Sequence, residues 1–192
     1  MTTPMVPRSR PQMARKQVEA LARDRGVTGP VYLVGLRGYY RDSMGAPGRN
    51  DLGIYDDAIF VVSDHAFASF NANTDPSLAR AGTATLLPGV WLYRLGIHGL
   101  SKPPEKRYRA LVQAAPVTVQ RIPVGDDAHA PLPTFTGYFG INIHRGALRS
   151  TASEGCQTIY PTQWPAFFAL VETEMKRAGA RTIPYLLAEG QG

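Results

Sequence analysis

The chain has 192 residues, with 21 Lys and Arg against 15 Asp and Glu, which gives a net charge of +6. This length favours a single domain, and the lone cysteine excludes an intramolecular disulfide and a cysteine-rich zinc site. The positive charge favours an anionic neighbour, but the basic motifs of standard nucleic-acid-binding folds are absent. We therefore expect no nucleic-acid partner, no metal and no other cofactor.

Residues 1–26 form a basic segment that ends in a predicted helix. The first eleven residues are rich in proline and are expected to be loosely held. Apolar residues then recur at helical spacing from Pro11 to Arg25, and Gly26 is a plausible stop. The helix is either packed on the domain with its basic face solvated, or a cationic helix that contacts an anionic outer-membrane surface.

Residues 27–192 are expected to form one domain rich in strands. Apolar runs predict strands over 31–40, 59–62, 88–98, 117–122 and 182–187. A helix is predicted over 163–178, capped by Thr162 and ended by Gly179, and a short helix over 106–115. The expected fold class is α+β, mainly β: a curved mixed sheet with two or three helices packed on it.

Oxygen side chains alternate at Asn71, Asn73 and Asp75, as they do at the start of a calcium loop. Pro76 and Gly82 stand where such a loop needs a glycine and an acid. We therefore interpret this segment as Asx turns.

The stretch from Gly137 to Gly146, followed by Ser153 to Gln157, carries the candidate chemistry, because it holds the only cysteine. Read as a strand, residues 137–144 direct Phe139, Ile141 and Ile143 to the core, and Asn142 and His144 to a working face. A thiol needs a base to become a nucleophile, and His144 lies twelve residues before Cys156. A backbone carbonyl or Asn142 is a candidate to orient His144. The amides of Gly155 and Cys156 are candidates to bind an oxyanion.

The pattern Ile143-His144-x-Gly146, then Ser153-x-Gly155-Cys156, resembles the signature of the YkuD-type L,D-transpeptidases. The resemblance covers roughly the C-terminal third of the chain. It implies the fold of that family for residues 27–192, with Cys156 as nucleophile, His144 as base, and Ser153 and Gly155 shaping the turn. Glu154 stands where the family usually has a second histidine.

The substrate implied by the resemblance is a peptidoglycan stem peptide, cut at an L,D bond. Arg145 and Arg149 flank the site and are candidates to bind a substrate carboxylate. His98 is a further candidate for substrate binding, because it ends a strand beside two glycines. Asn142 and Ser153 complete the predicted substrate-binding set.

The N-terminus lacks the apolar core of a signal peptide, and no apolar run is long enough to span a membrane. We expect a monomer that is made in the bacterial cytoplasm and acts on the cell wall in the periplasm. This favours a hydrolytic cell-lysis enzyme of the endolysin kind, and an L,D-transpeptidase or a secreted antibacterial effector is the alternative.

Two further interpretations stay open. In the first, the chain is a non-catalytic module that binds the wall or another polyanion, and Cys156 is inert. In the second, it is a cysteine protease that acts on proteins. Alkylation is expected to separate the enzyme from the binding module, because a thiolate paired with histidine reacts with iodoacetamide at pH 6 faster than a free thiol.

Overall fold

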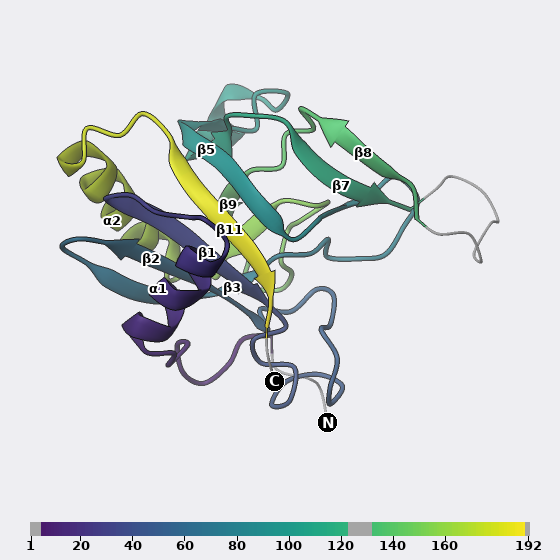
Figure 1. The fold of residues 1–192 in the computed structure, drawn as a ribbon. Helices are drawn as coiled ribbons and strands as arrows, with labels where there is room; N and C mark the ends of the chain where they lie inside the picture. Colours follow the sequence, from purple (N-terminus) through teal and green to yellow (C-terminus); the bar gives the residue numbers. More distant parts are fainter. Residues whose placement is uncertain (1–4, 123–131, 191–192) are drawn as a thin grey trace.

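The computed structural model describes residues 5–122 and 132–190, in which eight strands close into a barrel (Figure 1). Two α-helices, α1 (Arg15–Asp24) and α2 (Trp164–Arg177), pack on this barrel, and Pro104–Lys106 form a 3₁₀ turn, η1. The predicted α+β class with a mixed sheet and two helices is confirmed, and closure into a barrel adds to the expected curved sheet. In spatial order the barrel strands are β1 (Val31–Arg37), β11 (Ile183–Glu189), β5 (Gly89–His98), β6 (Tyr108–Gln113), β9 (Ile143–Arg145), β10 (Gln157–Ile159), β3 (Phe67–Asn73) and β2 (Asp57–Ser63).

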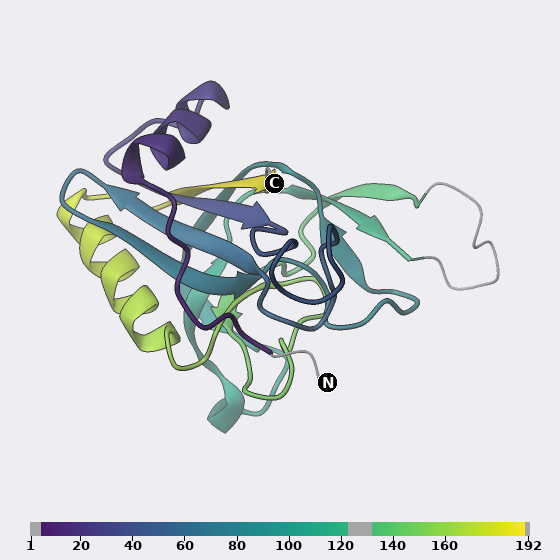
Figure 2. The same cartoon turned by 90° about the horizontal axis from the view of Figure 1, so that it is seen from below.

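The barrel is mixed, because β1 pairs in parallel with β11 and β9 in parallel with β10, whereas its other pairs are antiparallel. A second, three-stranded sheet has the order β4 (Ala84–Leu86), β7 (Val117–Arg121) and β8 (Thr134–Gly137). Strands β7 and β8 project from the barrel on the side away from α2 (Figures 1 and 2). The two sheets therefore meet on the far side of the barrel from α2.

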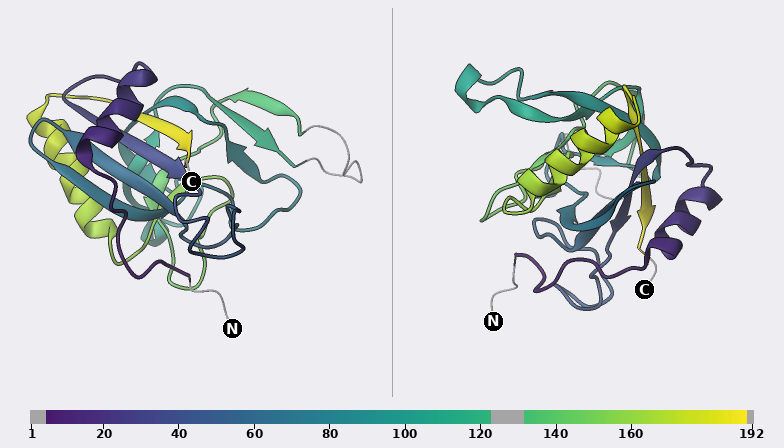
Figure 3. Two further views of the ribbon diagram at one scale, coloured as in Figure 1. Left: turned by 60° about the horizontal axis from the view of Figure 1, so that its bottom comes forward. Right: turned by 90° about the vertical axis from the view of Figure 1, so that its left-hand side faces the viewer.

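Strands β1 and β2 are buried on both faces, which explains their nearly uninterrupted apolar sequences. Leu33 and Val61 point to one cluster of core residues. Val34 and Phe60 point to the other cluster, which includes Val18 and Ala22 of α1. Figure 3 shows α1 lying against β1 and β11. The helix thus covers the outer face of the barrel.

Helix α2 packs through the face that its sequence predicts, since Trp164, Phe167, Val171 and Met175 all join the cluster of Leu33 and Val61. Full burial of a large apolar side chain contributes about 1.5–3 kcal/mol, so this face anchors the helix. Both predicted helix ends are also found, because Gly26 and Gly179 have φ angles of +72° and +63°. The predicted Thr162 cap is wrong: Gln163 is the N-cap residue, and its side chain makes no capping bond.

Two local predictions are wrong because pairing in the sheet overrides local sequence preference. The short helix expected over 106–115 is instead strand β6, which pairs with β5 and β9 and is needed to close the barrel. Asn71 and Asn73 lie in strand β3 and do not form Asx turns. Both polar side chains are buried at the end of that strand.

The segment before α1 is not loose over its described part. The carbonyl oxygens of Met5, Ser9 and Pro11 accept hydrogen bonds from Tyr55 N, Tyr40 Oη and Ser69 Oγ at 2.9, 2.9 and 2.7 Å. These bonds hold the segment along the barrel. Among the described residues, no helix is long and apolar enough to cross a membrane.

Candidate active site

Residues 137–144 do not form the single strand that their alternation predicts. Strand β8 ends at Gly137 and β9 begins at Ile143, so residues 138–142 pass as a loop from the small sheet to the barrel. Gly140 has a φ of +71°, a conformation that glycine adopts without strain. Ile141 and Ile143 are nevertheless buried as expected, whereas Phe139 packs only partly buried against the core. The working face is therefore made by a loop together with a strand end.

The cysteine turn is held by Ser153. Its hydroxyl donates to the Cys156 carbonyl at 2.7 Å and accepts from the Gly155 amide at 3.0 Å. Gly155 has a φ of +140°, and a Cβ at this position would collide with the carbonyl oxygen of Ala84. The Ser-x-Gly-Cys pattern thus has a physical reason in this chain, because only glycine fits between the turn and β4.

The expectation that the Gly155 amide binds an oxyanion is wrong for this structure, because Ser153 Oγ already occupies that amide. Within the described residues, no hydrogen bond to the Cys156 amide is found. Cys156 therefore keeps a backbone donor next to its own thiol, and Gly155 serves the shape of the turn.

Gln157, the residue after the cysteine, holds the turn through its buried side chain. Gln157 is buried, and its side-chain Nε2 donates to the carbonyls of Thr74 and Gly155, both at 3.3 Å. Its Oε1 accepts from Tyr185 Oη at 3.1 Å. Tyr185 reaches this position across Gly35, where any Cβ would collide with the tyrosine ring and hydroxyl. A glycine in β1 thus makes room for the side chain that holds the cysteine turn.

Cys156 directly precedes β10, and His144 lies in β9, the parallel neighbour of β10. The parallel register places Gln157 opposite Ile143 and Thr158 opposite His144, and side chains alternate along each strand. Cys156 Sγ lies 3.4 Å from both the Asn142 amide and the Gly140 carbonyl oxygen. In the described residues, no hydrogen bond joins Sγ to either nitrogen of His144. The thiol rests on the loop backbone.

His144 has a defined tautomer. Its Nδ1 lies 2.8 Å from the Arg145 carbonyl oxygen, which can only accept, so Nδ1 carries the hydrogen and Nε2 keeps a lone pair. Tyr108 Oη lies 3.2 Å from the same oxygen and 3.1 Å from Nδ1. Of the two candidates to orient His144, the backbone carbonyl makes the bond.

His98 stacks on His144, with ring centroids 4.0 Å apart. The side-chain Nδ2 of Asn142 lies 3.2 Å from His98 Nδ1, so the Asn142 side chain bonds to His98 and not to His144. Because an amide nitrogen only donates, His98 Nδ1 accepts and its hydrogen is on Nε2. The structure therefore brings His98, Asn142, His144 and Cys156 together, as the sequence predicts for a site.

The thiol and the imidazole are both neutral near pH 7. Burial, followed by the charge of His98, lowers the pKa of His144 to about 3. Burial raises the pKa of Cys156 to about 11, against the opposing hydrogen bond from the Asn142 amide. A neutral thiol reacts slowly with iodoacetamide at pH 6. Slow alkylation is therefore expected for the resting thiol, and alone it would not identify a binding module.

A cleft of about 900 Å³ opens beside the thiol and is lined by His98, Asn142 and Cys156. His144 is buried and does not line this cleft. Three cations that sequence reasoning missed do line it: Arg94, Lys102 and Arg121. Alternation along β5 places Arg94 and His98 on one face, a signal in the sequence from which Arg94 was predictable.

The two arginines predicted to bind a substrate carboxylate do not line the cleft. The Arg145 guanidinium lies 5.1 Å from the centre of the Tyr108 ring, and its side chain is exposed. Arg149 is exposed in the loop after β9. Arg145, the last residue of β9, packs on Tyr108, and Arg149 lies in the loop that follows, so neither side chain lines the cleft.

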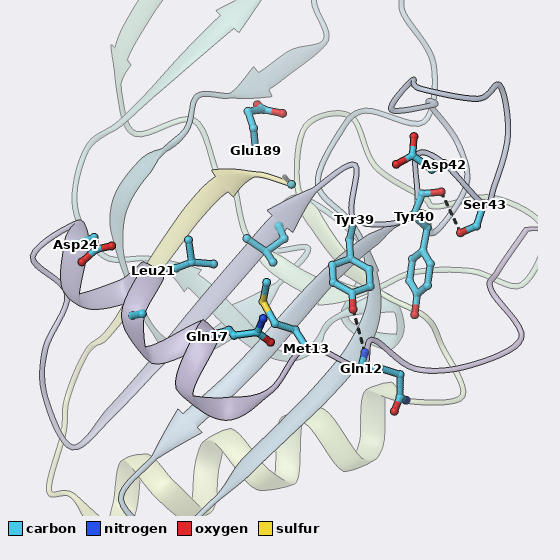
Figure 4. Close-up of a pocket in the computed structure, with 13 residues that line it drawn as sticks. Gln12, Met13, Gln17, Leu21, Asp24, Tyr39, Tyr40, Asp42, Ser43 and Glu189 are labelled. Carbon is cyan, nitrogen blue, oxygen red and sulfur yellow. Dashed lines mark hydrogen bonds between the residues drawn. The ribbon is translucent and has the colours of Figure 1, made fainter. Parts of the chain in front are cut away.

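A second cavity, of about 720 Å³, lies between α1 and the Tyr39–Tyr40 turn (Figure 4). Figure 4 shows Met13 and Leu21 to the left of Tyr39, and Gln12 below it, where Tyr39 Oη accepts from the Gln12 backbone amide at 3.0 Å. Its lining contains no cysteine or histidine. Of the two cavities, the cleft beside Cys156 is therefore the candidate site.

Comparisons with family models, with curated proteins and with solved structures found no match for this chain. The relation to L,D-transpeptidases accordingly stays a hypothesis carried by the motif residues.

Proposed function

We propose that the protein is a cysteine acyl-enzyme peptidase that cleaves L,D-peptide bonds in peptidoglycan stem peptides. The observation that carries the proposal is a cleft-lining thiol next to β10, with a histidine in the adjacent parallel strand β9. The Nδ1–H of that histidine is held by a carbonyl, which leaves Nε2 free to take a proton. The choice of L,D bonds rests on the resemblance of the Cys156 motif.

In the proposed first step, the Cys156 proton passes to His144 Nε2 while sulfur bonds to the substrate carbonyl carbon. Because the pKa of the imidazole lies far below that of the thiol, transfer accompanies attack and does not precede it. The Cys156 amide donates to the developing oxyanion. Absence of a resting Cys–His hydrogen bond does not count against this step, since such bonds often form only with substrate bound.

In the second step, the imidazolium gives its proton to the leaving amine as the peptide bond breaks. Water then attacks the thioester, His144 accepts the water proton, and the thiol is restored as the acid product leaves. If a second amine attacks in place of water, the same thioester yields a new peptide bond. The alternative of a transpeptidase, or of a secreted effector, therefore uses the same residues.

We further propose that hydrolysis dominates and that the protein acts as a monomeric cell-lysis enzyme on the wall in the periplasm. A non-catalytic wall-binding module is the second candidate function. One observation favours it: burial raises the pKa of the Cys156 thiol to about 11, as in an inert buried cysteine.

The test uses Gram-negative sacculi incubated with the wild type, Cys156→Ala, His144→Ala and His98→Ala, with muropeptides read by mass spectrometry. We expect stem peptides shortened at an L,D bond with the wild type and none with Cys156→Ala. Loss of the base is expected to slow cleavage about 10²–10⁴-fold. Loss of His98 is expected to slow it less, because His98 lines the cleft and stacks on His144 but takes no proton in the proposed steps.

The matched control is His65→Ala, because His65 is exposed and does not line the cleft. Its activity is expected to equal that of the wild type. New cross-links would make the protein a transpeptidase. Unchanged muropeptides with the folded wild type would rule out the peptidase and favour the binding module.

A further inference from the structure

The cleft beside Cys156 has an excess of positive charge supplied by three separate elements. Arg94 belongs to β5, Lys102 to the loop between β5 and η1, and Arg121 to the end of β7. Glu154 is the one carboxylate among the described lining residues, and it pairs with Arg80. A cleft lined by charges of one sign concentrates ligands of the other sign.

These three cations are not paired with carboxylates in the described part of the chain. Arg121 is held by the Gly82 carbonyl at 2.9 Å and by the Phe139 ring, whose centre lies 5.0 Å from the guanidinium carbon. Arg94 makes only a long bond, of 3.5 Å, to the Leu95 carbonyl. Arg121 is therefore held in place, and Arg94 is nearly free to move. The charges of both remain available to a ligand.

Lys102 lies in a turn that two hydrogen bonds hold in place. Its amide donates to the Gly99 carbonyl at 2.8 Å, and its own carbonyl accepts from Arg107 Nε at 2.7 Å. Gly99, with a φ of +80°, permits this turn. Lys102 is also close enough to the reacting group to lower the pKa of the Cys156 thiol, against the larger effect of burial. An anion bound at Lys102 would therefore lie near the scissile bond.

We infer that Lys102, together with Arg94 and Arg121, forms a carboxylate-binding subsite that selects peptides with free carboxylates beside the cut bond. The inference rests on the proposed function for the peptide nature of the ligand. It replaces the carboxylate clamp expected at Arg145 and Arg149. Arginine forks and a lysine ammonium both bind carboxylates through charge-assisted hydrogen bonds. A substrate whose carboxylates are amidated loses those bonds.

Binding is measured separately from cleavage, with Cys156→Ala as the host and two synthetic stem tetrapeptides as ligands. One peptide carries free carboxylates, and the other has its side-chain and α-carboxylates next to the L,D bond converted to primary amides. Titration calorimetry is expected to show about ten- to a hundredfold weaker binding of the amidated peptide. Adding Lys102→Met is expected to weaken binding of the free peptide by a similar factor and to leave the amidated peptide almost unchanged.

The matched control is Lys106→Met, which removes the same charge from an exposed residue of η1 outside the cleft lining. It is expected to preserve the preference for the free peptide. Equal affinity for the two peptides, absence of binding to either, or the same loss with Lys106→Met would overturn the subsite. Selective binding by a wild-type protein that cuts neither peptide would support the subsite while overturning the peptidase.

Discussion

The cleft beside Cys156 and the polar cluster around Asp57 differ in how their charges are balanced. In the cleft, the cations Arg94, Lys102 and Arg121 have no described carboxylate partner. In the cluster, Asp57 is fully buried, and its two oxygens accept from the amides of Gly38 and Thr74, both at 2.5 Å.

Arg37 completes the cluster. Its Nε lies 3.1 Å from Asp75 Oδ1, and its Nη2 donates to the carbonyls of Thr74 and Leu86, both at 2.9 Å. The same Thr74 carbonyl receives Gln157, the residue after the cysteine. Buried charges thus join β1, β3 and β4 beneath the cysteine turn, while the cleft leaves its charges open. One set of charges therefore supports the structure, and the other has no described carboxylate partner.

Removal of one cation from each region tests whether the two sets of charges have different roles. Arg37→Met leaves buried carboxylates unpaired and is expected to lower the free energy of unfolding by about 3–5 kcal/mol. Arg94→Met removes an exposed charge and is expected to change it by less than about 0.5 kcal/mol. Urea unfolding measures both, and equal losses would contradict the division.

Asp56, beside the cluster, should also titrate with a sign opposite to that of the two site histidines, whose pKa values are lowered by burial. Burial, opposed by the hydrogen bond from the Asp51 amide, raises the pKa of Asp56 from 3.8 to about 6. The folded chain then holds a proton that the unfolded chain releases, so stability falls as pH rises from about 4 to 6 and levels off above. We expect a contribution of up to about 1.4 kcal/mol per pH unit in this window.

Asp56→Asn isolates this contribution, because other carboxylates titrate alike in both proteins. Thermal or urea unfolding at successive pH values is expected to show that the variant lacks the fall between about pH 4 and 6. Parallel curves for the two proteins would show that Asp56 ionises normally in the folded state.

A smaller effect tests the cysteine turn itself. Gly155 and Gly29 have φ angles of +140° and +136°, but a Cβ collides with Ala84 at Gly155 and meets nothing within 4 Å at Gly29. Both substitutions by alanine incur backbone strain, and Gly155→Ala is expected to cost about 1–3 kcal/mol more. Urea unfolding compares them, and a similar cost for both would show that the contact with β4 gives way easily.

The fold could be predicted where one physical effect dominates. Apolar runs over 31–40 and 59–62 predict strands because burial on both faces demands apolar residues. Helix α2 was predictable from Phe167, Val171 and Met175, which recur on one face. Closure into a barrel was not predictable, because it depends on distant pairs such as Leu111 with Ile143.

The site was predictable only in part. Cys156, His144 and Ser153 follow from a local pattern, since the turn and the strand pair that join them are close in sequence. The alternation through 137–144 misled, because these residues leave one sheet and enter another. Lys102 and Arg121 carry no local signal for a site: they line the same cleft as Cys156 although they lie far from it in the sequence. The neutral state of Cys156 depends on burial, which the sequence does not display.

Hydrogen bonds join the backbone just before Cys156 to the segment of residues 77–84. Ser77 N donates to the Ser153 carbonyl at 2.8 Å, and Ala84 N to the Glu154 carbonyl at 3.1 Å. Insertions or deletions between residues 77 and 84 would therefore shift one attachment relative to the other and displace the thiol. The loop of residues 99–103 has no such tie to the cysteine turn among the described bonds. A change of length in this loop would therefore leave the position of the thiol unchanged, whereas one between residues 77 and 84 would displace it.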